Sequence, residues 1–210
     1  MPVSPFQSLK NKVFAQLYFA QTISLLGDAL TWVALALLAF ELAGEQGSAR
    51  LLSIALLMRV SIFVLVSPYA GVLADCIDKK TILGVTHIFR MFIVGAFPFV
   101  IREWHIYALV GALNFFNAFF TPTYKATIPQ VIDDKETYGQ AISLSSATYQ
   151  LLGVLGPGLA GIMAVWFGAR EIFYIDAATF LIAAILIYFL PKRLSVPNKV
   201  TPASQRNWSS

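Results

Sequence analysis

The chain has 210 residues, of which 58% are hydrophobic and 12% are charged, and its mean hydropathy is +0.71. A soluble domain carries about 25% charged residues, so this composition excludes an ordinary water-soluble enzyme or binding module. The net charge of +4 is too small, and the hydrophobic content too high, for a disordered chain. We therefore expect an integral membrane protein.

The hydrophobic residues fall into six runs that are bounded by charged or turn residues. In chain order these runs are 13–40, 51–73, 81–101, 106–120, 141–167 and 172–190. A transmembrane helix needs about 20 mostly apolar residues, and no run alternates polar and apolar residues as a strand would. The sequence predicts an all-α protein with six transmembrane helices, the fourth of which extends through Tyr124 to reach full length.

Basic residues between the predicted spans set the orientation, because positive charge accumulates on the cytoplasmic side. One side has ten: Lys10, Lys12, Lys79, Lys80, Lys125, Lys135, Lys192, Arg193, Lys199 and Arg206. The other side has three: Arg50, Arg102 and Arg170. We therefore expect residues 1–12 and 191–210 to be cytoplasmic segments on either side of a bundle over 13–190. The dispersed lysines argue against a nucleic-acid surface, and the inner connection 121–140 is predicted to lie as a short interfacial helix.

Five ionisable side chains lie within the predicted spans: Asp28, Arg59, His87, Arg90 and Asp176. Such groups are expensive inside a membrane and indicate function, although a fixed ion pair that only joins helices is the alternative. At about 1.5 Å per residue, Asp28, Arg59 and Arg90 lie at similar depths near the middle of the membrane. Asp28 can therefore pair with either arginine. We rank His87 lower, and we expect Asp176, near the outer end, to be a helix-contact or water-facing group.

Asp28 also belongs to a polar stripe on the first predicted helix. Gln21, Ser24, Asp28 and Thr31 are spaced by three, four and three residues, which places them on one helical face. Desolvation destabilises the ionised form of a carboxylate, and a nearby arginine stabilises it. With both effects present, Asp28 can exchange a proton near neutral pH. We predict a proton-coupling or substrate pathway of Asp28, Arg90, Arg59, Gln21 and Ser24.

The fifth predicted span is rich in small residues. Two rows share a four-residue spacing: Gly156, Ala160, Ala164 and Gly168, and Gly153, Pro157 and Gly161. Such rows let another helix approach closely, although tight packing alone explains them equally well. Pro157 removes one helical hydrogen bond and is expected to bend the helix.

The sequence predicts neither an enzyme nor a metal or cofactor site. One cysteine and two histidines are too few for a thiolate or histidine metal site. The chain has no phosphate-binding P-loop, so ATP-driven transport would need another subunit. A membrane-embedded hydrolase is disfavoured because the nucleophile and metal sets are missing.

Residues 71–83 read Gly71-Val-Leu-Ala-Asp75-Cys-Ile-Asp-Lys79-Lys80-Thr-Ile-Leu. This stretch resembles the loop signature of the major facilitator superfamily, Gly-x-Leu-Ala-Asp-Arg-x-Gly-Arg-Lys, with departures at Cys76 and Asp78. Three further features are similar to the branch that includes enterobactin and macrolide exporters: residues 24–28, Arg90 and the prolines of 122–129. The row Gly153, Gly156, Pro157, Gly158 and Gly161 resembles the glycine-proline motif of the drug/proton antiporters of the family.

The resemblance implies one six-helix half of the superfamily fold, built as a 3+3 inverted repeat. It implies that Asp75 helps to latch two halves together, that Gly71 lets two helices approach, and that Lys79 and Lys80 belong to the same conformational loop. Family members usually have twelve spans, so a second half or a homodimer is the implied partner, besides lipid and a small-molecule substrate. The implied function is secondary active, proton-coupled efflux across a bacterial inner membrane. A non-transporting remnant or a structural membrane subunit is the alternative.

Overall fold

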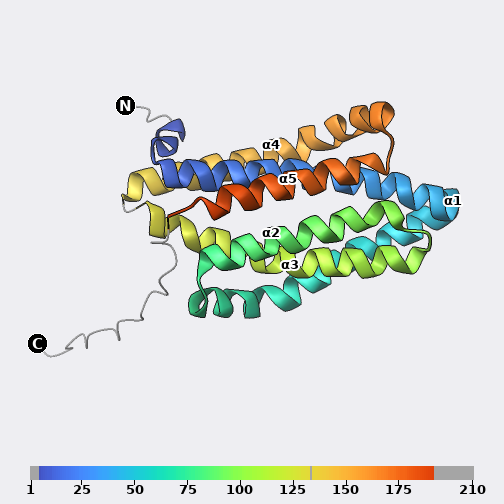
Figure 1. Ribbon diagram of the computed structural model, residues 1–210, viewed down its shortest axis with the longest axis horizontal. Coiled ribbons are helices and arrows are strands. Elements are labelled where there is room, and N and C mark those ends of the chain that lie inside the picture. Colours follow the sequence, from blue (N-terminus) through green and yellow to red (C-terminus); the bar gives the residue numbers. More distant parts are fainter. Residues whose placement is uncertain (1–4, 133, 192–210) are drawn as a thin grey trace, which may run out of the picture.

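The computed structural model describes residues 5–132 and 134–191, without the side chains of Pro5 and Asp75. Every element in these two stretches is helical, which confirms the all-α class (Figure 1). The elements are η1 (Pro5–Lys10), α1 (Lys12–Cys76), α2 (Lys79–Ala96), η2 (Phe97–Phe99), α3 (Glu103–Val131), α4 (Lys135–Phe167) and α5 (Glu171–Tyr188), where η marks a 3-10 helix. The predicted segments 1–12 and 191–210 lie partly outside the described residues, at 1–4 and 192–210.

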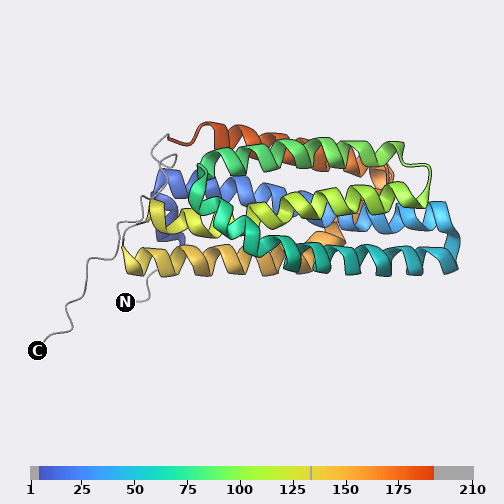
Figure 2. The same ribbon diagram turned by 90° about the horizontal axis from the view of Figure 1, so that it is seen from below.

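Helix α1 contains the first two predicted spans. Its 65 residues would measure about 98 Å as one straight rod, against about 30 Å for the core of a bilayer. The helix is broken at Gly44, where φ is 67° and ψ is −171°, a conformation that is essentially restricted to glycine. The chain reverses there, so a first arm (12–43) and a second arm (45–76) run in opposite directions (Figure 2). The described residues therefore form five α-helices rather than the six predicted.

Four stretches are long and apolar enough to cross a membrane: Lys12–Ala74, Lys79–Phe99, Lys135–Phe167 and Glu171–Tyr188. Helix α3 covers the fourth predicted span and is not among them. Its 29 residues are sufficient in length. The apolar sequence of α3 is interrupted by polar and turn residues: Asn114, Asn117, Thr121 and Pro122. These side chains lower its hydropathy, which explains why this span is the weakest in the sequence.

The prediction of an interfacial helix over 121–140 is wrong. Helix α3 continues to Val131 and α4 begins at Lys135, so the stretch forms the end of one long helix and the start of the next. Pro122 and Pro129 lie inside α3. A proline costs one backbone hydrogen bond, and packing against neighbouring helices compensates for that loss in membrane proteins. The prolines were therefore misleading as markers of a helix end.

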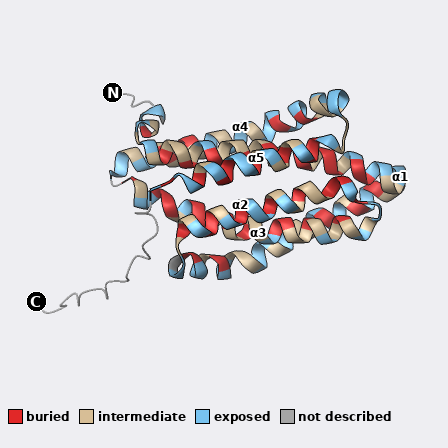
Figure 3. Cartoon of the chain, viewed as in Figure 1, coloured by how far each residue is buried: buried red, intermediate tan, exposed pale blue. Residues whose placement is uncertain are grey.

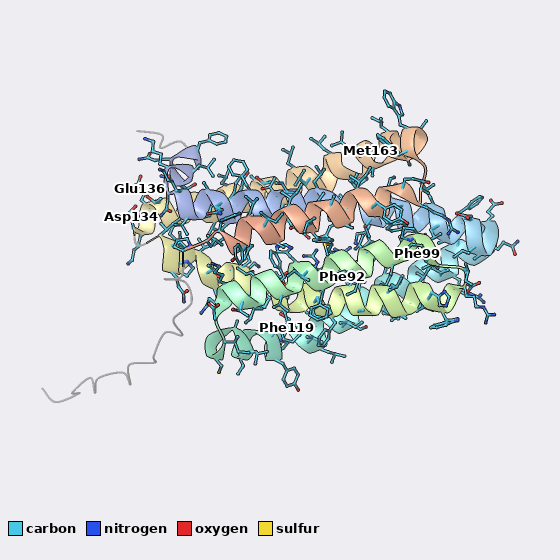
Figure 4. All side chains as sticks on the ribbon, in the orientation of Figure 1. Phe92, Phe99, Phe119, Asp134, Glu136 and Met163 are labelled. Atoms are coloured by element: carbon cyan, nitrogen blue, oxygen red, sulfur yellow. The ribbon has the colours of Figure 1, made fainter. Side chains whose placement is uncertain are left out.

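Asp134 ends the short connection and caps α4. Its carboxylate accepts hydrogen bonds from the backbone N–H and the hydroxyl of Thr137, both at 2.8 Å. These two hydrogen bonds hold the pKa of Asp134 below its usual value. Figure 4 shows Asp134 and Glu136 at the end of the bundle where α3 meets α4. The acidic cluster of the sequence thus starts a helix.

The bundle is built around α1, which contacts α3, α4 and α5, while α2 packs against α3 and α5. Buried residues line the inward sides of the helices, as Figure 3 shows. The Gln16 amide donates to the carbonyl of Leu186 at 2.8 Å, which joins the start of α1 to the end of α5. Both described ends of the chain therefore lie at one end of the bundle (Figure 1).

The opposite end is held by Arg170, in the connection between α4 and α5. Its guanidinium forms an ion pair with Glu41 at 2.8 Å and donates to the carbonyl of Pro98 at 2.6 Å. Arg50 and Glu103 add a second, looser ion pair at 3.5 Å. Arg170 thus ties the α4–α5 connection to the end of the first arm and to η2, and Arg50 ties the second arm to the start of α3.

The second arm of α1 and helix α4 present wide apolar faces to the outside. Val154, Val165 and Trp166 on α4 are exposed by 77%, 84% and 80%, and Leu57 and Tyr69 on the second arm by 67% and 77%. A soluble monomer rarely leaves so much contiguous apolar surface uncovered. These faces suit contact with lipid or with another membrane helix, which supports the membrane class.

Candidate functional site

An ion pair between α1 and α2 forms the centre of the candidate site. Nη2 of Arg90 donates to both carboxylate oxygens of Asp28, at 2.7 Å and 2.6 Å. The Arg90 side chain is 1% exposed and the Asp28 side chain is 21% exposed. The arginine is thus sealed inside the bundle, whereas the carboxylate can still be reached from outside. Charge-assisted hydrogen bonds of this kind are among the strongest in proteins.

Of the two arginines open to Asp28 in the sequence, the structure pairs it with Arg90. Arg59 lies over the ring of Trp32, with its guanidinium carbon 4.6 Å from the ring centre. This is a cation–π contact between the two arms of α1. Arg59 is therefore not brought to the carboxylate.

Aromatic rings surround the Arg90 guanidinium on its other sides. Its central carbon lies 4.1 Å from the ring centre of Phe180 on α5 and 5.6 Å from that of Phe120 on α3. Nε of Arg90 is buried and has no hydrogen-bond partner among the described residues. Arg90 therefore contacts three helices, and it retains one unused N–H donor in an apolar setting.

The polar stripe on the first arm points into the bundle. Ser24 and Thr31 are each 1% exposed, and Ser24 donates to the carbonyl of Gln21 on its own helix at 3.0 Å. Oε1 of Gln21 is buried without a partner in the described part of the chain. The stripe therefore faces protein, with Asp28 as its one ion-paired member.

Asp176 on α5 is a buried member of the same cluster. It is fully buried, and it accepts hydrogen bonds from the hydroxyls of Thr31 at 2.5 Å and Thr179 at 2.9 Å. The helix-contact interpretation of Asp176 holds, and the water-facing one is wrong. The signal in the sequence was the spacing of Asp176 and Thr179, which places both on one turn of α5, but it does not reveal the partner Thr31.

Gly27 makes the contact between α1 and α5 possible. A Cβ atom at position 27 would lie 1.9 Å from Oδ1 of Asp176 and 2.2 Å from the hydroxyl oxygen of Thr179. No side chain fits at such distances. The glycine next to Asp28 thus forms the notch that receives the Asp176 carboxylate, a role that sequence reasoning missed.

His87 lies one turn before Arg90 on α2 and is fully buried. Its ring centre is 4.8 Å from that of Phe120 and 6.0 Å from that of Phe180. Neither ring nitrogen has a hydrogen-bond partner among the described residues. His87 therefore borders the cluster without a bond to either acid.

The loop between the second arm and α2 is held by two capping contacts. Asp78, a departure from the family signature, caps α2 by accepting from the backbone N–H groups of Lys80 and Thr81 at 3.2 Å and 3.0 Å. Nζ of Lys80 donates to the carbonyl of Leu190 at 2.6 Å, just past the end of α5, and Lys79 is buried. The loop thus joins α2 to α5.

Two other residues of the loop motif are less constrained. The side chain of Asp75 lies outside the described part of the structure. A Cβ atom at Gly71 would meet no heavy atom within 4 Å among the described residues. Within the described part of this chain the surface at Gly71 is open, so the expectation that Gly71 lets two helices approach stays a prediction.

The glycine-proline row divides into one packed residue and several open ones. A Cβ atom at Gly156 would lie 2.5 Å from Cβ of Ala29 on α1, so this glycine brings α4 close to the residue after Asp28. Cβ atoms at Gly153, Gly158 and Gly161 would meet nothing within 4 Å, and Pro157 is exposed. Gly156 thus serves helix packing, whereas the other residues of the row lie on a face of α4 that no described residue covers.

The cluster of Asp28, Arg90 and Asp176 has the groups for proton binding or for contact with a charged ligand. Two acids share one arginine, so the cluster carries one excess negative charge when both acids are ionised. No group of three or more metal-ligating side chains occurs among the described residues. Uptake of a single proton would make the cluster neutral.

Comparison with known proteins identifies the family. The sequence profile of the Major Facilitator Superfamily matches residues 17–210. The chain is 31% identical over 193 residues to the uncharacterized MFS-type transporter YfiS of Bacillus subtilis, and covers 45% of that protein with 91% of its own length. It is 26% identical over 182 residues to macrolide efflux protein A of Streptococcus pyogenes, with 43% of that protein and 83% of this chain covered.

A third relative is the multi-drug resistance efflux pump PmrA homolog of Lactococcus lactis. It is 29% identical over 126 residues, which are 60% of this chain and 30% of that protein. The chain spans less than half of the length of each of these three relatives, and no solved structure matches it. The chain belongs to the Major Facilitator Superfamily of membrane transporters.

Proposed function

We propose that this chain is a six-span half of a proton-coupled efflux carrier, in which Asp28 binds the proton. The observation that carries the proposal is the Asp28–Arg90 ion pair at 2.6 Å, whose arginine is buried inside the bundle. An ionised pair at such a position is costly and is retained in transporters for proton or substrate binding. Three of the compared relatives are named as transporters or efflux proteins, which supports transport as the process.

The difference in exposure between the two partners supports Asp28 as the residue that binds the proton. Arginine stays charged in proteins, and its side chain is 1% exposed here. Asp28 is 21% exposed, so water can deliver a proton to its carboxylate. Protonation breaks the ion pair and thereby links proton binding to the packing of α1 against α2. That link is what a proton-coupled carrier requires.

The six spans in this proposal are the two arms of α1 and helices α2 to α5. The two ends of the described chain, before the first span and after the sixth, lie at one end of the bundle (Figure 1), as an even number of crossings requires. The excess of lysine and arginine in the sequence segments assigned to that side supports a cytoplasmic location of both termini. In this arrangement the first three and the last three spans form the 3+3 repeat, in a bacterial inner membrane.

A single bundle of this kind has half a transport pathway, because alternating access needs one bundle to move against another. The exposed apolar faces of the second arm and α4 offer room for such a partner. A second six-helix half or a second copy of the chain is the proposed partner, and the Asp75 loop and the open face of the glycine-proline row are the proposed contact regions. A non-transporting remnant is the alternative if no partner exists.

Transport is tested in inverted membrane vesicles that contain the chain, with ethidium and radiolabelled erythromycin as probes. We expect accumulation of at least one probe that is driven by a proton gradient, abolished by a protonophore, and lost in Asp28→Asn. A chain that acts as a homodimer shows this activity alone. Activity that Asp28→Asn leaves unchanged contradicts the role of Asp28.

A second measurement separates an inert half from a remnant. Infrared difference spectroscopy of the chain in lipid detects the C=O band of a carboxyl group that becomes protonated on acidification. We expect one such band to vanish in Asp28→Asn and to persist in the control Asp134→Asn, whose side chain is exposed. If vesicles show no transport but the Asp28 band is present, the chain is a half that needs a partner. If vesicles show no transport and no infrared band depends on Asp28, the proposed function is wrong.

A further inference from the structure

Protonation of Asp28 would change the charge balance around Arg90, and among the described residues α5 carries the acid that can restore it. When Asp28 takes up a proton, Arg90 loses its counter-ion and stays charged. Leaving a buried charge unpaired is strongly destabilising. Arg90 contacts Asp28 on α1, Phe120 on α3 and Phe180 on α5. The other described titratable groups that interact with it electrostatically are His87 on its own helix and Asp176 on α5. Asp176 is the remaining acid of this set.

We propose that Asp176 is the second counter-ion of Arg90, and that the guanidinium passes from Asp28 to Asp176 when Asp28 is protonated. The inference rests on the proposed function, since it assumes that Asp28 binds the proton. In the step, a proton from water joins the Asp28 carboxylate and converts it to a carboxyl group. The hydrogen bonds from Arg90 to Asp28 are replaced by hydrogen bonds from Arg90 to Asp176. The charge of the cluster changes from −1 to zero.

The geometry of Arg90 favours this exchange. The guanidinium already lies 4.1 Å from the ring centre of Phe180, which is four residues after Asp176 and therefore on the same face of α5. Its Nε–H donor is buried and unused. Asp176 interacts electrostatically with both Arg90 and Asp28. Reorientation of the arginine side chain toward α5 would thus give the free donor an acceptor.

The geometry of Asp176 fits the role of a fixed acceptor. The carboxylate is fully buried, and each of its oxygens already accepts one hydroxyl hydrogen bond, from Thr31 and Thr179. An ionised carboxylate has about four acceptor sites, so two are left for a guanidinium. The notch at Gly27 holds Asp176 against α1. Asp28 is thus the acid that water can reach, and Asp176 the acid that is held in place.

The variant Asp28→Asn isolates the second state, because it removes the charge of Asp28 as protonation does. Arginine labelled with ¹⁵N and aspartate labelled with ¹³C allow solid-state NMR to detect whether the Arg90 guanidinium is close to an aspartate carboxylate in lipid. We expect a contact in the native chain at neutral pH and a persisting contact in Asp28→Asn. We expect that contact to vanish in the double variant Asp28→Asn with Asp176→Asn. Absence of an Arg90–aspartate contact in Asp28→Asn overturns the proposal.

The pH profile gives a second readout that a purely structural role would not change. Removal of the negative charge in Asp176→Asn should make proton uptake by Asp28 harder. We expect the midpoint of the Asp28 infrared band to move to lower pH by about one unit or more, as for a like charge less than about 10 Å away. Thr31→Val, which removes one hydroxyl donor, should change the midpoint less. The exposed control Asp134→Asn should leave it unchanged.

The two hypotheses fail in different ways. If no band depends on Asp28, the proposed function fails. If the band is present but its midpoint is the same in Asp176→Asn, the function stands and the role of Asp176 is wrong. If Asp176→Asn does not fold, the NMR contact in Asp28→Asn still decides, and its absence rejects the proposal.

Discussion

Arg59 and Arg90 have the same charge and similar expected depths, yet only Arg90 reaches Asp28. The difference arises from how each helix is rotated about its axis, which depends on packing between helices far apart in the sequence. Arg59 lies over Trp32 instead. The sequence could predict that an acid near the middle of the first span needs a basic partner. It could not select the partner, because both arginines satisfied the same local pattern.

Asp176 shows the same limit for an acidic residue. Its position near a predicted span end suggested a contact or a water-facing group, and the structure buries it completely. Its burial depends on Gly27, 149 positions earlier in the chain, whose missing side chain leaves space for the carboxylate. A glycine within a helix does not by itself reveal which side chain fills the space beside it.

Gly27→Ala should destabilise the bundle. The new methyl group would lie 1.9 Å from Oδ1 of Asp176, so α5 or the carboxylate must move and the Thr31 hydrogen bond is strained. Overpacking of this kind typically costs about 1–3 kcal/mol. The matched control is Gly153→Ala on α4, where the methyl group meets open space. Thermal unfolding in detergent checks the comparison, and equal melting temperatures for the two variants would argue against the notch.

At the scale of helices, the apolar runs of the sequence were more informative than the prolines and acidic residues that usually mark helix ends. The apolar runs located each helical segment, because the need to bury or immerse an apolar face acts over the whole segment. Three ends lie six or seven residues from the predicted ones: the second arm begins at 45, α3 ends at Val131 and α4 begins at Lys135. The stretch 121–140 was misread because prolines and acids usually mark helix ends. In the structure Pro122 and Pro129 lie inside α3, and Asp134 starts α4.

Gly44 is the residue on which the reversal of α1 depends. Its φ of 67° and ψ of −171° are strained for any residue with a side chain, at a cost of about 1–3 kcal/mol. Gly44→Ala should therefore destabilise the chain by that amount. Gly71→Ala in the same helix, with no atom within 4 Å and no positive φ, should be neutral or slightly stabilising. Denaturant titration of both variants measures the difference, which would vanish if the turn tolerated a side chain.

Asp134 makes the start of α4 sensitive to acid. Its pKa is held below the usual value by hydrogen bonds from Thr137. The stabilisation is therefore present above the usual aspartate pKa and is lost as the pH falls through the lowered one. The amide chemical shift of Thr137 should titrate with a midpoint below about 3.9, the ordinary aspartate value.

Asp134→Asn is the control for this titration, because asparagine caps helices about as well as aspartate but does not ionise in this range. The Thr137 amide shift should be flat over the same acid range in this variant. A titration with the same midpoint in both proteins would show that another group is responsible.

At the scale of the whole molecule, the described residues form one helical bundle with a buried polar centre and exposed apolar faces. The cluster of Asp28, Arg90 and Asp176 joins α1, α2 and α5, whereas the second arm and α4 carry the widest exposed apolar faces (Figure 3). The chain spans less than half of its compared relatives. In our proposal the bundle holds the proton-binding cluster, and a second bundle completes the substrate pathway.

Residue-by-residue labelling from each side of the membrane tests the six-span arrangement most directly. In a Cys76→Ser background, single cysteines are introduced by Gln7→Cys, Glu45→Cys, Arg102→Cys and Pro191→Cys, and a membrane-impermeant maleimide is applied to sealed vesicles of known orientation. The account predicts that positions 7 and 191 react from the cytoplasmic side, as does Cys76 in the unaltered chain, and that positions 45 and 102 react from the other. Labelling of positions 7 and 45 from the same side, or of 7 and 191 from opposite sides, would contradict it.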